Sequence, residues 1–260
     1  MSANIAVKPG ETKLEYRERM IAEMKAATLR RRKEISSGKV PVVMDVDDFG
    51  LLMPGYDDLL RLKKSFPKFK ITGFTIPLPK EFYQEQNAKQ FTVEKYKKWA
   101  AIVNEQDWIE VAIHGFSHVH NEMEVSYEKA TDLLKATENL FAQVGLKYSK
   151  IFKAPYWQYS YDALVALRDR GYVVGIDRNH QRPVPDGLQT YIYNWSFEEP
   201  LPEGDIIKGH GHFTGANKNN IGDTLANILH HLPADAHFMT IGEYQEKYGA
   251  KGIINLAEKK

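Results

Sequence analysis

Short apolar segments typical of β-strands alternate with amphipathic segments typical of α-helices along almost the whole chain. The strand-like segments are apolar and often β-branched, whereas the helix-like segments repeat apolar residues at helical spacing. Repeated β-then-α units predict a parallel sheet, and seven or eight units in one chain favour a closed or nearly closed barrel over an open sheet. The expected strands are 39–46, 70–76, 108–113, 149–155, 172–176, 189–195, 204–210 and 236–240, and the expected helices are 56–66, 91–105, 126–145, 161–171, 221–232 and 241–249.

A further helix is expected at residues 11–35, before the first strand, and Ser36, Ser37 and Gly38 end it. Its apolar residues fall near helical spacing, with charged residues between them. The chain therefore divides into an N-terminal helical extension, residues 1–38, and a barrel, residues 39–260. We expect the helix to pack on the outside of the barrel or against a partner, such as a second copy in a homo-oligomer.

Composition restricts the chemistry that the chain can perform. It has 260 residues and no cysteine, so a bound metal would have to be held by His, Asp, Glu or water. A formal net charge of +1 gives no basic field for nucleic acid. No apolar run approaches the roughly 18 residues that span a bilayer, and the N-terminus has no apolar export segment. We expect a cytoplasmic protein without a membrane span.

Polar residues gather where the expected strands end. The first strand ends in the acidic segment DVDD, the third ends at His114, and a late strand ends at His210. The carboxyl ends of barrel strands form the face on which barrel enzymes place catalytic groups. The long segments 77–90 and 178–188 are expected to be loops of that face.

The segment DVDD brings three carboxylates together. Alternation along a strand places Asp45 and Asp47 on one face, with Asp48 near the turn. Adjacent carboxylates repel one another unless a cation or a shared proton relieves them. An exposed turn or a helix N-cap cluster is the alternative, but the apolar run before the acids would bury this strand.

Two histidines follow the third strand, His114 at its tip and His118 in the loop or first turn beyond it. Both can then point at one ion, and two neutral imidazoles with a carboxylate make a catalytic site that keeps a position open for water. Two hydrogen-bonded surface histidines are the alternative for this spacing taken alone.

The segments DVDD, HGFSH, FKAPYW and IIKGH occur in the order and approximate spacing of the motifs of the polysaccharide deacetylase (NodB-like, carbohydrate esterase family 4-type) superfamily. Nearly everything after the N-terminal helix resembles this family. The resemblance implies a distorted (β/α) barrel of about seven strands. It also implies that Asp47 is the catalytic base and that Asp48 binds a metal beside His114 and His118.

The segment FKAPYW resembles the third motif of the family, which usually carries Arg at the position of Lys153. A lysine keeps the charge but lacks the planar fork of a guanidinium, so it would hold Asp47 less firmly. Pro155 fits the motif, and by resemblance the backbone N–H of Tyr156 would stabilise an oxyanion. Trp157 suits packing at the rim and stacking on a sugar equally well.

The remaining motifs supply further candidates. The fourth motif is poorly matched, and Asp177 and Trp195 are its candidates for substrate binding. His210 aligns best with the last motif and would be the general acid. His212 points to the same side of a strand and is the alternative acid or a substrate-binding residue.

The resemblance implies a metal-dependent hydrolase that removes an acyl group, acetyl above all, from the amide nitrogen of an amino sugar or saccharide. Its metal would be divalent, with zinc as the first choice and iron, cobalt or manganese suited to the same ligands. One alternative is a hydrolase of the same fold that cleaves another linear amide, such as a small amide, or an ester. The other is a catalytically silent barrel that only binds carbohydrate, since a fold by itself does not fix function.

Overall fold

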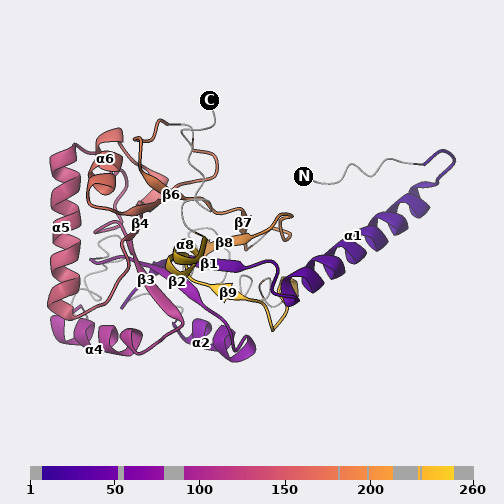
Figure 1. Ribbon diagram of the computed structural model, residues 1–260, viewed down its shortest axis with the longest axis horizontal. Helices are drawn as coiled ribbons and strands as arrows, with labels where there is room; N and C mark the ends of the chain where they lie inside the picture. The colour runs from indigo at the N-terminus through magenta and orange to yellow at the C-terminus, as the bar shows by residue number, and fades with distance from the viewer. Residues whose placement is uncertain are drawn as a thin grey trace.

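The computed structural model describes residues 8–51, 56–78, 91–180, 182–197, 199–212, 228 and 230–248. Within these ranges nine strands form one curled, parallel sheet in the order β6-β5-β4-β3-β2-β1-β8-β7, with β9 paired to β1 (Figure 1). The predicted α/β fold is therefore confirmed, as a half-barrel. The strands are β1 Val42–Phe49, β2 Ile71–Thr75, β3 Ile109–His114, β4 Ile151–Lys153, β5 Val173–Gly175, β6 Gln189–Tyr191, β7 Trp195–Ser196, β8 Ile207–His212 and β9 Phe238–Met239.

Helices connect the consecutive strands from β1 to β5, as the alternation predicts. The helices are α1 Lys13–Ser36, α2 Tyr56–Ser65, α4 Val93–Asn104, α5 Tyr127–Val144, α6 Tyr161–Asp169 and α8 Ile241–Tyr248. Thr92, Ser126 and Ser160 cap α4, α5 and α6 by accepting a backbone N–H, which satisfies a donor that a helix start leaves open. The helix predicted at 221–232 and the loop predicted at 77–90 lie mostly outside the described residues.

The strand predicted at 189–195 is two short strands with different partners. β6 pairs with β5, and β7 pairs with β8. Asn194 lies between these two strands, and its side-chain amide binds the backbone at the start of β8. Nδ2 donates to the carbonyl of Ile206 over 2.9 Å, and Oδ1 accepts from the N–H of Lys208 over 2.7 Å. These side-chain hydrogen bonds hold the backbone at the point where it stops pairing with β5 and begins to pair with β8.

β1 is an interior strand of the sheet and pairs with β2, β8 and β9. All eight of its residues are buried, as expected for a parallel strand that is covered on both faces. The sheet is parallel, so the carboxyl ends of β1, β3, β4 and β8 lie at one edge, where the polar residues of the sequence gather.

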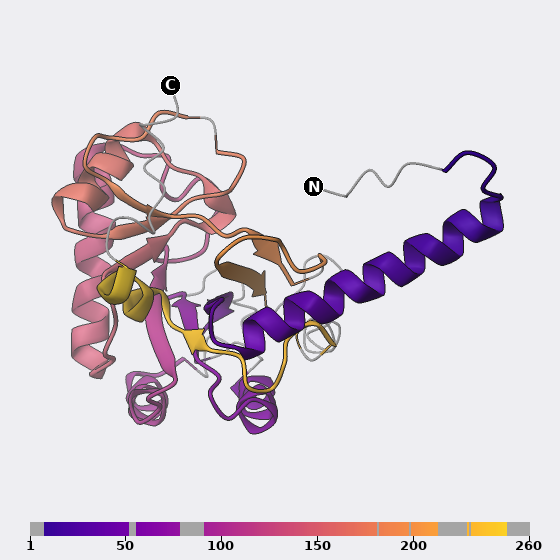
Figure 2. The same ribbon diagram turned by 45° about the vertical axis from the view of Figure 1, so that its right-hand side comes forward.

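Helix α1 extends away from the sheet in both views (Figures 1 and 2). It starts at a capping box made by Thr12 and Glu15. Ile35 is its buried residue, and the apolar side chains exposed along it are Leu14, Ile21, Met24 and Leu29. No helix among the described residues is long and apolar enough to cross a membrane.

Candidate metal centre and active site

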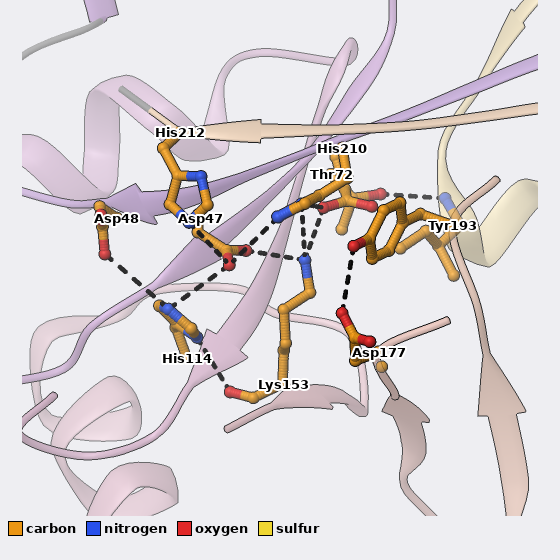
Figure 3. A network of polar contacts seen from close by, with 12 residues as sticks. Asp47, Asp48, Thr72, His114, Lys153, Asp177, Tyr193, His210 and His212 are labelled. Atoms are coloured by element: carbon orange, nitrogen blue, oxygen red, sulfur yellow. Dashed lines mark hydrogen bonds and ion pairs between the residues drawn. The ribbon is translucent and has the colours of Figure 1, made fainter. Parts of the chain in front are cut away.

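The end of β1 carries three buried carboxylates. Asp45 and Asp47 share a face because side chains alternate along a strand. Asp48 would point to the opposite face, but its φ is 60°, and the pairing of β1 with β2 shifts register between Val46 and Phe49. Asp48 thereby lies on the same side of the site as Asp47 (Figure 3).

The three residues predicted to bind a metal lie together. Asp48 Oδ1 is 3.3 Å from His118 Nε2 and 3.8 Å from His114 Nε2, and one ligand atom from each residue lies within 4.8 Å of the others. His114 Nδ1 donates to the carbonyl oxygen of Lys153 over 3.0 Å, which leaves Nε2 as the nitrogen available to an ion. Burial lowers the pKa of His114 and favours the neutral imidazole. This donor set fits a divalent metal ion.

The loop between the two histidines is held by Glu122, whose carboxylate accepts the N–H groups of Phe116 and Ser117 over 2.7 and 2.6 Å. Burial raises the pKa of Glu122, against the effect of these hydrogen bonds. A Cβ at Gly115 would lie 2.1 Å from Glu122 Oε2 and 2.7 Å from the ring of Pro155. Sequence reasoning missed Glu122 because its spacing from His114 matches no motif.

Lys153 is completely buried between carboxylates. Its Nζ lies 2.6 Å from Asp45 Oδ1 and 2.7 Å from Asp47 Oδ1, and 3.9 Å from the centre of the Phe74 ring (Figure 3). Burial alone would raise the pKa of Asp47, but the charge of Lys153 and the neighbouring imidazoles outweigh it and hold this pKa below its ordinary value. Asp47 is therefore a carboxylate, with Oδ1 occupied by the ammonium.

The two histidines of β8 face the same carboxylates. The register of β1 and β8 pairs Asp45 with His210 and Asp47 with His212. His210 is buried, with Nδ1 2.7 Å from Asp45 Oδ1 and Nε2 3.9 Å from Asp47 Oδ2. The half-exposed His212 has Nε2 3.7 Å from Asp47 Oδ2. Asp47, His210 and His212 thus form a second group of converging donor atoms.

A tight turn at Pro155–Trp157 follows β4 and forms one wall of the site. Tyr156 and Trp157 both have left-handed φ values, 57° and 60°. Tyr156 is exposed and its ring contacts that of His118 at 5.3 Å, whereas the half-buried Trp157 contacts His210 at 5.2 Å. Pro155 is buried.

The two candidates from the fourth motif have different surroundings. Asp177 accepts a hydrogen bond from the Tyr193 hydroxyl over 3.1 Å, and the Tyr193 ring lies 4.9 Å from that of His210. Trp195 does not reach the site: it is fully buried, and its indole N–H donates to the carbonyl of Glu199 over 2.7 Å. Sequence reasoning missed Tyr193, which the break between β6 and β7 places beside His210.

No family model and no curated protein matches the sequence. Solved structures match across most of the chain. A Mycobacterium smegmatis protein named a polysaccharide deacetylase has 13% identity, covers 82% of this chain and 91% of its own, and gives a TM-score of 0.56. The Bc1960 peptidoglycan N-acetylglucosamine deacetylase has 18% identity, covers 78% and 86%, and gives 0.50. A family 4 acetyl xylan esterase from Clostridium thermocellum, solved with a cobalt ion, has 16% identity, covers 80% and 92%, and gives 0.50. The fold of this chain is that of polysaccharide deacetylases and family 4 carbohydrate esterases.

Proposed function

We propose that this chain is a metal-dependent deacetylase that removes an acetyl group from the amide nitrogen of an amino sugar or saccharide. The observation that carries the proposal is the position of the buried Asp47 carboxylate. Its Oδ1 is 2.7 Å from the Lys153 ammonium, and its Oδ2 is 3.7 Å from Nε2 of His114, a candidate metal ligand. A fold shared with proteins that are named deacetylases and an esterase supports the same class of reaction.

Asp48, His114 and His118 would hold the metal. A bound divalent ion supplies an activated water and polarises the carbonyl group that the water attacks. Zinc is the first choice for two imidazoles and a carboxylate, and iron, cobalt and manganese suit the same donors.

Asp47 would accept a proton from the attacking water. The pKa of Asp47 is held below its ordinary value by Lys153 and the imidazoles, so the carboxylate needed for this role is present at neutral pH. Lys153 fixes Oδ1 and leaves Oδ2 facing the candidate metal ligands. The backbone N–H of Tyr156 would stabilise the negative charge that develops on the carbonyl oxygen.

The departing nitrogen needs a proton, because an amine anion is a poor leaving group. We assign His210 as the donor. Trp157 and His212 lie at the same edge of the sheet and would contact the substrate, and Asp177 would act there through Tyr193. The buried Pro155 would hold the turn that carries Trp157. Trp195 has no place in this substrate face because it is buried in the core.

Metal content is the first test, measured on purified protein after incubation with zinc or cobalt. We expect near one equivalent in the wild type and little in His114→Ala. His120→Ala is the matched control, because His120 belongs to the same loop but not to the candidate ligand group, and this variant should keep its metal. Absence of metal from the wild type would overturn the mechanism.

Turnover then separates the deacetylase from its two alternatives. The substrates are N-acetylated sugar oligomers, small linear amides and p-nitrophenyl acetate. A deacetylase should lose turnover but keep its metal in Asp47→Asn. A hydrolase of other small amides or esters would ignore the oligomers. A silent carbohydrate-binding barrel would turn over none of them and would keep its affinity for sugar in the same variant.

A further inference from the structure

Asp45 contacts His210 more closely than any other polar side chain of the described residues does, yet the proposed reaction gives Asp45 no task. Asp45 is fully buried, and its Oδ1 lies 2.7 Å from His210 Nδ1. The contact follows from the sheet, since Asp45 on β1 and His210 on β8 are Cα partners in register. Neighbouring parallel strands therefore hold the carboxylate and the imidazole side by side.

The chemistry of the contact locates a proton. The ammonium of Lys153 donates a hydrogen bond to the same Asp45 Oδ1 over 2.6 Å, so this oxygen is already an acceptor. A carboxylate oxygen accepts hydrogen bonds and does not donate them. An unprotonated Nδ1 at 2.7 Å would place two lone pairs against each other, so Nδ1 of His210 carries a hydrogen. Lys153 Nζ is farther from this nitrogen, at 3.3 Å, and donates to the carboxylates instead.

We propose that Asp45 is a positioning residue that fixes the orientation and tautomer of His210 and stabilises its protonated ring. This inference rests on the proposed function, in which His210 is the acid. With Nδ1–H directed at Asp45, Nε2 is left facing Asp47 and the space where a substrate would react. Two carboxylates, Asp45 and Asp47, then face the ammonium of Lys153 and the Nδ1–H of His210.

Asp45 also distinguishes the two histidines of β8. The contact of His212 with a carboxylate uses Nε2 and joins it to Asp47, and its side chain is half exposed. The Nδ1 of His210, by contrast, is held by a buried carboxylate while its Nε2 points into the site. A histidine held at one nitrogen delivers a proton from the other in a fixed direction, which is the arrangement that an acid requires.

The oxygen of water bonds to the carbonyl carbon while Asp47 takes one proton from that water. The carbon–nitrogen bond then breaks and its electron pair stays on nitrogen. The Nε2 proton of His210 completes the amine, and the ring remains bound to Asp45 through Nδ1–H. The products are a carboxylic acid and an amine.

Leaving-group dependence provides the test, with wild type and Asp45→Asn assayed on an N-acetylated sugar and on p-nitrophenyl acetate. The amide needs a proton on its leaving nitrogen, whereas p-nitrophenolate leaves without one. We expect Asp45→Asn to lower kcat on the amide by about 100-fold, within the usual contribution of general acid catalysis, and to change ester turnover by less than about 3-fold. Equal losses on both substrates, or no loss on either, would overturn the inference.

The matched control is Glu110→Gln, which alters an acid on β3 whose partners are Thr72, Ser149 and Gly242, not His210. In this variant any loss of turnover should be the same for the amide and for the ester, as expected for a purely structural change.

Imidazole nitrogen NMR on metal-free protein gives a second readout that does not need turnover. The His210 signals, assigned through His210→Gln, should show a hydrogen on Nδ1, and a bare Nδ1 would refute the inference. Wild-type protein that cleaves neither substrate would refute the proposed function instead, and the spectrum would still decide whether Asp45 holds this proton.

Discussion

Nδ1 of His114 lies 3.0 Å from the backbone carbonyl oxygen of Lys153. One residue thus orients a candidate metal ligand with its main chain and holds the candidate base, Asp47, with its side chain. The two residues are Cα partners in β3 and β4, so the pairing of these strands fixes both arrangements. A change confined to the side chain of Lys153 should therefore affect Asp47 while leaving His114 oriented.

Lys153→Met should lower the free energy of unfolding by about 3–5 kcal/mol, because it leaves Asp45 and Asp47 buried without their cation. Denaturant titration of metal-free protein measures the change. Lys129→Met, which alters an exposed lysine of α5, is the control and should stay within about 0.5 kcal/mol of wild type. A loss below about 1 kcal/mol would show that Lys153 does not compensate the two acids.

Asp47 should make the stability of the metal-free protein sensitive to acid. Its pKa is lower in the folded protein than its ordinary value of 3.8, so the unfolded chain takes up this proton first as the pH falls. The stabilisation is present above the ordinary value and is lost as the pH falls below it. Denaturation midpoints between pH 7 and pH 3 should therefore fall more steeply for wild type than for Asp47→Asn. Parallel slopes would contradict the lowered pKa.

Glu122→Ala should weaken metal binding by about 10- to 100-fold, the usual effect of losing a group that orients a ligand. The variant frees the N–H groups of Phe116 and Ser117, which hold the loop that carries His118. Competition with a chelator measures the affinity. Glu124→Ala is the control, since Glu124 is exposed and paired with Arg182. Equal metal affinities in the two variants would show that Glu122 is not needed to position the metal ligands.

Gly115→Ala should be more destabilising than Gly145→Ala, although both glycines have left-handed φ values, 65° and 74°. The backbone strain of alanine, about 1–2 kcal/mol, is common to both. Nothing lies within 4 Å of a Cβ at Gly145, whereas a Cβ at Gly115 would collide with Glu122 and Pro155. Thermal or denaturant unfolding gives the difference, and Gly115→Ala should also lose metal. Similar stabilities would mean that the loop moves aside freely.

Much of the architecture was predictable because it depends on local patterns. Apolar residues recur with different periods in strands and in helices, so the elements can be told apart in the sequence. The carboxyl ends of parallel strands meet at one edge of the sheet, which is why Asp47 and His114 are expected together. The break between β6 and β7 was not predictable, because it depends on hydrogen bonds from Asn194 to a distant strand. A continuous strand would place Tyr193 and Trp195 on one face, but the break directs Tyr193 to the site and Trp195 to the core.

Four residues of the candidate site have left-handed backbone: Asp48, His118, Tyr156 and Trp157. Such conformations cost about 1–3 kcal/mol each in residues other than glycine. Glycine would relax each position. A lineage that no longer used the chemistry would gain stability by replacing these residues with glycine. We therefore expect all four side chains to be retained together only while selection acts on the site.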